Sequence, residues 1–200
     1  EVNTFLDKKT SIYIASEILG RFSFVEDGKI PQNILFNFIK EIVSHYDREK
    51  AIYHNDLHAG DVMQTVYTIF IRGQLTRKMN LSKLDFFAML TAAFCHDYKH
   101  PGTNNLYNIN ARNKYAMRYN DISVLENYHV SQAFKIMKAK PECNVLDIFI
   151  GNDYKKIRNN IINCVLKTDM SNHQKTQQTF NLRITTFKID KGNNIENMFK

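Results

Sequence analysis

Hydrophobic residues recur every three or four positions along several stretches of the chain, a spacing that places them on one face of an α-helix. In residues 33–46 this face consists of Leu35, Phe38, Ile39, Ile42 and Tyr46. The same period predicts helices over residues 56–73, 82–96, 121–138 and 154–173. No convincing stretch alternates between hydrophobic and polar residues as a β-strand does, and the chain contains only 3 prolines and 7 glycines. The pattern therefore predicts an all-α fold, a compact helical bundle.

The residues that flank these stretches indicate where the helices begin and end. The helix over 56–73 has a side chain suited to cap its N-terminus at Asn55 or Asp56, and Ser82 is suited to cap the next one. We expect that next helix to end at Pro101–Gly102, because proline cannot continue a helix. Asp121 is the expected cap of the helix over 121–138.

Composition narrows the class of protein. The length of 200 residues suits one domain, and 44% hydrophobic with 24% charged residues is ordinary for a globular protein. No segment approaches the run of about 18 apolar residues that a membrane span needs, and the N-terminus does not resemble a secretory signal. The 3 cysteines have no paired spacing, which favours a reducing, intracellular compartment on the cytoplasmic side of the membrane. Although the formal charge is +7, the lysines are scattered, so we expect no nucleic-acid partner.

Two histidines lie where the helix over 56–73 begins, in the segment YHNDLHAGDV. His54 precedes the helix and His58 is in its first turn, a spacing like that of the HExxH zinc signature. Asn55 stands where that signature has its glutamate base, so protease chemistry is not indicated. On these residues alone, the segment fits either structural histidines or a functional site.

The segment HDYKHPGTNN places His96, Asp97 and His100 at the end of an apolar helix. Histidine near a helix C-terminus is favoured by the helix dipole, so a simple cap is one interpretation. A carboxylate at the same place is repelled by that dipole, which makes Asp97 unsuited to a cap. Imidazole and carboxylate together suit zinc, and a carboxylate can bridge two cations. We therefore favour a metal site over a cap.

Two later helices also turn polar groups toward their apolar side. Glu126 shares a face with Val130, and a buried carboxylate needs a partner such as a histidine, a metal or a metal-bound water. Asp169 and His173 are one turn apart and are expected to continue the face of Val165, either as a structural pair or as part of a site. Polar groups on the inner side of several helices predict a shared polar pocket, the expected active site.

The segments YHNDLHAGDV, HDYKHPGTNN, NDISVLENYH and KTDMSNH, in this order, resemble the class I cyclic nucleotide phosphodiesterases of the HD metal-phosphohydrolase group. The resemblance covers about residues 50–175 and implies that residues 1–200 are the N-terminal and middle part of one catalytic domain. It implies hydrolysis of the 3′ phosphoester bond of cAMP or cGMP to a nucleoside 5′-monophosphate, by a hydroxide activated by two metals and a histidine general acid. The implied cofactors are Zn²⁺ together with Mg²⁺ or Mn²⁺, and regulatory domains or a larger assembly can lie outside this chain.

Carried over residue by residue, the resemblance implies a role for each motif position. The implied protein ligands of the first metal are His58, His96 and Asp97, the last of which also bridges to the second metal. The positions around the water shell of the second metal are His100, Glu126 and Thr168. His54 is the implied general acid, and Glu126 is expected to orient it. The residues that line or support the nucleotide pocket are Tyr53, Asn105, Asp169 and Met170, with His129 and His173 in supporting positions.

The chain departs from the family pattern in three respects. Tyr128 precedes His129 where the family has two histidines, and Lys167 stands where a small residue is usual. The fourth metal-ligand aspartate and the purine-binding glutamine are absent, since Asp190 does not have the matching context. The simplest interpretation is a catalytic domain that is incomplete at its C-terminal end. The alternatives are an inactive phosphodiesterase-like assembly or binding subunit, and another HD-type phosphohydrolase.

Overall fold

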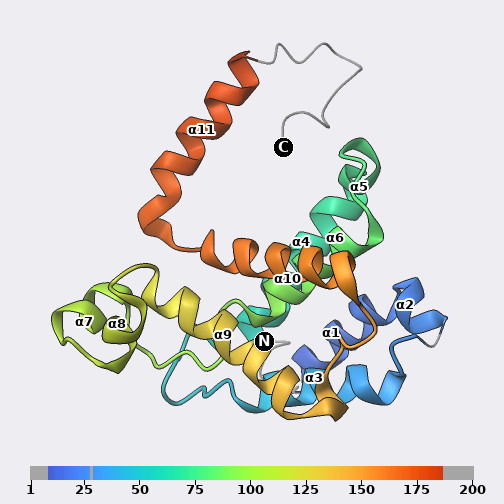
Figure 1. Cartoon of the computed structure of the whole chain (residues 1–200), viewed down its shortest axis with the longest axis horizontal. Coiled ribbons are helices and arrows are strands. Elements are labelled where there is room, and N and C mark those ends of the chain that lie inside the picture. Colours follow the sequence, from blue (N-terminus) through green and yellow to red (C-terminus); the bar gives the residue numbers. More distant parts are fainter. Residues whose placement is uncertain (1–8, 28, 187–200) are drawn as a thin grey trace.

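A computed structural model describes residues 9–27 and 29–186, and over these residues the chain is helical without a β-strand (Figure 1). The all-α prediction is confirmed. The helices are α1 (Lys9–Gly20), α2 (Ser23–Glu26), α3 (Gln32–Ser44), α4 (Asp56–Arg72), α5 (Leu75–Lys78), α6 (Lys83–Cys95), α7 (Asn105–Asn110), α8 (Lys114–Tyr119), α9 (Val124–Ala139), η2 (Pro141–Cys143), α10 (Gly151–Leu166), η3 (Met170–Asn172) and α11 (His173–Thr186).

Helix α6 forms the centre of the hydrophobic core. It packs against α4 on one side and α10 on another, while α1 packs against both α3 and α4. Phe87, Leu90 and Phe94 of α6 are fully buried, and most other residues of this helix are buried as well. A helix that is apolar on all sides is stable only when other elements surround it. The end of α6 is therefore held by the core on every side.

The predicted starts of α4 and α6 are confirmed. The Asn55 side chain accepts hydrogen bonds from the backbone N–H groups of Leu57 and His58, as an N-cap does. Ser82 and Asp85 form a reciprocal capping box at the start of α6. Both caps are local, because donor and acceptor are at most three residues apart.

The range predicted for α6, residues 82–96, is confirmed, but the expected stop at Pro101–Gly102 and the expected cap at Asp121 were wrong. Helix α6 ends at Cys95, well before Pro101, because residues 95–100 form tight turns and Lys99 has a left-handed backbone with φ of 62°. Asp121 does not cap α9, which begins at Val124. The first turn of α9 instead receives its acceptor from a distant residue, since Leu125 N donates to Asn105 Oδ1 at 2.9 Å.

The prediction for the end of α10 was also wrong. Helix α10 stops at Leu166, and Asp169 becomes the N-cap of the short helix η3 through a bond from Ser171 N. His173 then begins α11, which projects away from the other helices (Figure 1), and this histidine is exposed. Asp169 and His173 therefore do not extend one helix face.

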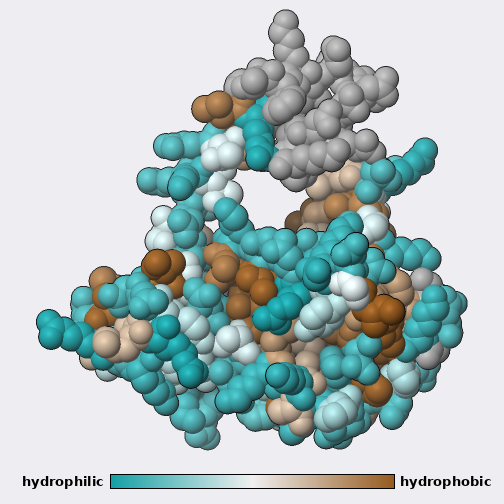
Figure 2. Space-filling model, in the orientation of Figure 1, coloured by the Kyte–Doolittle hydropathy of each residue, from teal (hydrophilic) through white to brown (hydrophobic). Residues whose placement is uncertain are grey.

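The viewed face of the molecule is mostly hydrophilic, with hydrophobic groups in separate places (Figure 2). Within the described ranges, no helix combines the length and apolar character needed to cross a membrane.

Candidate active site

Three side chains from two helices converge on one point at the end of α6. His58 Nε2 lies 3.2 Å from His96 Nε2 and 3.4 Å from Asp97 Oδ2, and His96 Nε2 lies 2.9 Å from the same oxygen. His58 comes from the first turn of α4, and His96 is the C-cap residue of α6. The turn after α6 adds Asp97 and His100, and α9 adds His129, whose Nε2 is 3.9 Å from Asp97 Oδ1.

Backbone carbonyls fix the orientation of two of these imidazoles. His96 Nδ1 donates to the carbonyl of Ala93, and His129 Nδ1 donates to the carbonyl of Tyr98, each at 2.8 Å. A neutral ring whose proton is on Nδ1 presents a lone pair at Nε2. This is the arrangement by which protein histidines are prepared to bind a metal.

The electrostatics of the cluster fit a cation. Asp97 Oδ2 is buried, and the nearby Nε2 atoms of His58 and His96 can donate to it only when one of these rings carries a proton on that nitrogen. Burial alone raises the pKa of Asp97, yet the contacts with His58 and His96 hold it well below its usual range. Electron-rich atoms at such short distances need a positive charge between them. The residues present therefore fit a divalent cation held by His58, His96 and Asp97.

Three histidines of the cluster have pKa values shifted in different directions. Burial alone lowers the pKa of His96, but the contact with Asp97 outweighs burial and the pKa lies above its ordinary value. Burial lowers the pKa of His100 to about 4 and that of His129 to about 3, so both rings are neutral near pH 7. Because a metal needs the lone pair on Nε2 of His96, cation binding at this site would compete with protonation of that nitrogen.

His54 lies against the cluster but is not one of the converging ligands. Its ring stacks on His100 with a centroid distance of 4.2 Å, and the exposed Tyr53 packs on His58 at 4.6 Å. Gly102 N donates to His100 Nδ1 at 3.0 Å, which orients the ring on which His54 stacks. The half-buried His54 therefore borders both the cluster and solvent.

Glu126 and Asn105 form a second polar pair beside the cluster. The Asn105 amide donates to both carboxylate oxygens of Glu126, at 2.9 and 3.3 Å. Burial raises the pKa of Glu126, and the charges of Asp169 and Asp97 raise it further. The hydrogen bonds recorded for Glu126 thus go to Asn105 rather than to His54.

The remaining predicted residues lie around η3. Asp169 is buried and accepts a hydrogen bond of 2.6 Å from Ser123 Oγ, which joins η3 to the start of α9. The hydroxyl of Thr168 donates to the carbonyl of Val165 at 2.8 Å. Met170 is 72% exposed and His173 is also exposed, so these two side chains are available to a ligand rather than part of the core. Asp190 lies outside the described residues.

Over residues 53–199, the chain matches the family described as 3′5′-cyclic nucleotide phosphodiesterase. The chain belongs to this family. Its relatives include the 3′,5′-cyclic-nucleotide phosphodiesterase regA of Dictyostelium discoideum, 38% identical over 175 residues, which are 88% of this chain and 22% of the relative. The probable 3′,5′-cyclic phosphodiesterase pde-1 of Caenorhabditis elegans is 38% identical over 161 residues, which are 80% of this chain and 24% of the relative.

Solved phosphodiesterase domains share the fold. The crystal structure of the phosphodiesterase domain of the RhoPDE fusion protein from the choanoflagellate Salpingoeca rosetta superposes with a TM-score of 0.79 at 28% identity. The superposition covers 96% of this chain and 57% of that chain. The present chain therefore spans less than a quarter of the two curated phosphodiesterases above and somewhat more than half of the solved domain.

Sequence reasoning missed two contacts that shape the site. Ser123 was not singled out, because its partner Asp169 is 46 residues away. Asp56 was considered only as a helix cap, whereas its side chain is fully buried and binds Arg48. A charged residue next to a motif histidine was the available signal for Asp56, but its partner could not be read from the chain.

Proposed function

We propose that this chain is part of a catalytic domain that hydrolyses the 3′ phosphoester bond of a 3′,5′-cyclic nucleotide, cAMP or cGMP, and releases a nucleoside 5′-monophosphate. The observation that carries the proposal is the convergence of His58, His96 and Asp97, with His54 stacked beside them on His100. Family membership agrees with this chemistry, since the relatives are named as cyclic nucleotide phosphodiesterases.

The proposed cofactors are two divalent cations, Zn²⁺ and either Mg²⁺ or Mn²⁺. Such cations supply Lewis acidity, which promotes ionisation of water and neutralises charge on a phosphate. His58, His96 and Asp97 would hold the first cation, and Asp97 would also face the second. We assign His100, Glu126 and Thr168 to the surroundings of the second cation.

His54 is the proposed proton donor. In the reaction, a water oxygen forms a bond to phosphorus, the bond from phosphorus to O3′ breaks, and O3′ must gain a proton. A histidine that borders solvent can deliver this proton and recover another from water. We assign Tyr53, Asn105, Asp169 and Met170 to the nucleotide pocket, with His129 and His173 in support.

The test is hydrolysis of cAMP and of cGMP by the full-length protein supplied with zinc and magnesium. We expect turnover that falls by about 100-fold or more in His54→Ala, because general-acid catalysis contributes about 10² to 10⁴. His45→Ala is the control, since His45 is exposed at the end of α3. Absence of turnover in protein that holds two cations would refute the proposal and favour an assembly or binding subunit.

A further inference from the structure

A buried carboxylate lies two residues after His54, at the start of α4. Asp56 is fully buried, and its oxygens accept bonds from Arg48 Nε at 2.7 Å, from an Arg48 terminal nitrogen at 2.9 Å and from Ser11 Oγ at 2.7 Å. A bidentate arginine–carboxylate pair is among the strongest and most directional side-chain contacts. These contacts join α1, α4 and the segment that connects α3 to α4.

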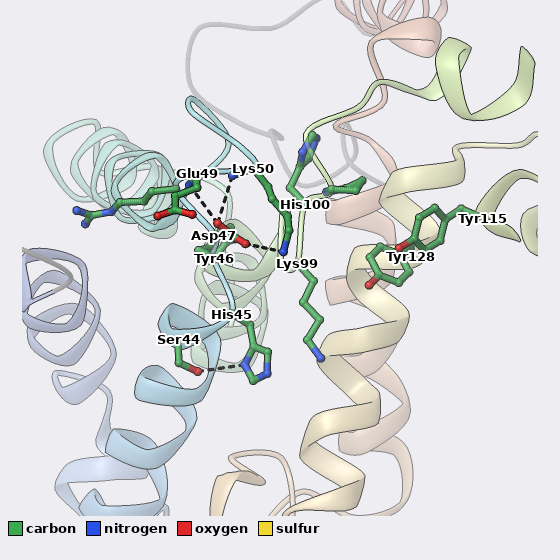
Figure 3. A pocket seen from close by; sticks show the side chains of 12 residues that line it. Ser44, His45, Tyr46, Asp47, Glu49, Lys50, Lys99, His100, Tyr115 and Tyr128 are labelled. Atoms are coloured by element: carbon green, nitrogen blue, oxygen red, sulfur yellow. Dashed lines mark hydrogen bonds and ion pairs between the residues drawn. The ribbon is translucent and has the colours of Figure 1, made fainter. Parts of the chain in front are cut away.

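That connecting segment, residues 45–55, carries His54. Asp47 accepts hydrogen bonds from the backbone N–H groups of Glu49 and Lys50, so the segment folds back on itself, and Figure 3 shows His100 beside it. The Lys50 carbonyl lies directly against Gly102 of the turn that follows α6. Arg48 therefore anchors a folded segment that contacts the turn after α6 through Lys50, two residues further along.

We propose that Arg48, Asp56 and Ser11 form a positioning clamp that holds residues 45–55 so that His54 stays stacked on His100. The clamp acts through His54, and in this respect it rests on the proposed function. Arg48 and Asp56 are positioning residues, because the hydrogen bonds that join them to each other and to Ser11 lie outside the cluster of His58, His96 and Asp97.

The clamp has a chemical consequence because proton transfer depends on placement. A displacement of about 1 Å can lower a rate by about 100-fold. Replacing Asp56 by asparagine removes the carboxylate charge from the bidentate pair with Arg48 and weakens its hydrogen bonds, so the segment should move. Since His54 acts only when O3′ departs, kcat should fall while KM changes little.

The experiment compares Asp56→Asn with Asp85→Asn in the full-length protein loaded with zinc and magnesium. Asp85 is a matched control: it lies in the first turn of α6 and accepts bonds from Lys156 and Asn160 of α10. The first readout is the rate at which diethyl pyrocarbonate modifies His54, measured by mass spectrometry, with the exposed His173 as internal reference. This readout needs no turnover, so it tests the clamp even where the proposed function fails.

We expect Asp56→Asn to raise the modification rate of His54 at least about threefold relative to His173, and to lower kcat by about 10- to 100-fold with KM within about twofold. Asp85→Asn should change neither quantity. In a His54→Ala background, Asp56→Asn should lower kcat no further. Arg48→Lys and Ser11→Ala keep more of the contacts and should change the His54 modification rate and kcat in the same directions but by less. These two variants replace Asp56→Asn in the experiment if that variant does not fold. Unchanged His54 reactivity in the folded variants, or an equal loss of kcat with and without His54, would overturn the proposal.

Discussion

Replacing Gly102 by alanine tests the close approach between the His54 segment and the metal-ligand turn. Gly102 has a φ of 81°, a left-handed conformation that side chains disfavour. A Cβ atom there would lie 2.1 Å from the Lys50 carbonyl oxygen, whereas real Cβ contacts are essentially never under 3.0 Å. The two segments must therefore separate by most of an ångström.

The cost combines two effects. Forcing alanine into a left-handed backbone costs about 1–2 kcal/mol, and overpacking adds about 1–3 kcal/mol. We expect Gly102→Ala to lower the free energy of unfolding by about 2–5 kcal/mol. Gly151→Ala separates the two effects, because Gly151 also has a positive φ, of 57°, but an added Cβ meets nothing within 4 Å. Its expected cost is the conformational part alone, about 1–2 kcal/mol.

Equilibrium unfolding in urea measures both variants against the wild type, with the slope compared to verify that the unfolded states are equivalent. A lower midpoint for Gly102→Ala than for Gly151→Ala is the expected result. Equal midpoints would show that the Lys50 segment yields freely, and would refute the close-packed contact. The same variant should disturb His54, since Gly102 N also orients His100.

Three further changes probe the core, the metal cluster and a helix cap. Phe87→Ala should destabilise the protein by about 3–5 kcal/mol in thermal unfolding, because Phe87 is fully buried and its ring centroid lies 5.3 Å from that of Phe22. Phe36→Ala should cost little, because the Phe36 side chain is exposed. Asp97→Asn should weaken zinc binding by more than about 100-fold in calorimetry, and wild-type affinity in this variant would contradict the assigned ligand set. Burial alone raises the pKa of Asp85, but bonds from Ser82 and Lys156 hold it below its ordinary value of 3.8. Its stabilising contribution is therefore present above pH 3.8 and lost as pH falls further, so the difference in stability between wild type and Asp85→Asn should shrink in acid.

The success of sequence reasoning depended on the distance between interacting residues along the chain. The caps at Asn55 and Ser82 were predicted correctly because their partners are two or three residues away. The start of α9 was predicted wrongly because the side chain that accepts a bond from its first turn, Asn105, belongs to α7. The structure brings His58, His96 and Asp97 together, in agreement with the expected shared polar pocket, because buried polar groups need partners. Their roles as metal ligands, which the family resemblance implied, stay a prediction.

The Asp56–Arg48 pair shows what local patterns leave out. Its two residues are only eight positions apart, but the connection folds back on itself, and no periodicity describes such a segment. The expected helix stop at Pro101–Gly102 was wrong for a related reason. The turn that follows the helix contains Lys99 in a left-handed backbone conformation, and lysine has no particular preference for that conformation that the sequence could reveal.

Because α6 is buried in the core, we expect the affinity of the proposed site for a cation to depend on how well the core is packed. His96 and Asp97 follow directly after a helix whose residues are mostly buried, so the packing of that helix fixes their positions. Interiors are packed too tightly to absorb a shift locally, and a defect near Phe94 would reach the ligand atoms two residues later. We therefore expect substitutions in the core of α6 to weaken cation binding at the proposed site even when they touch none of its ligands.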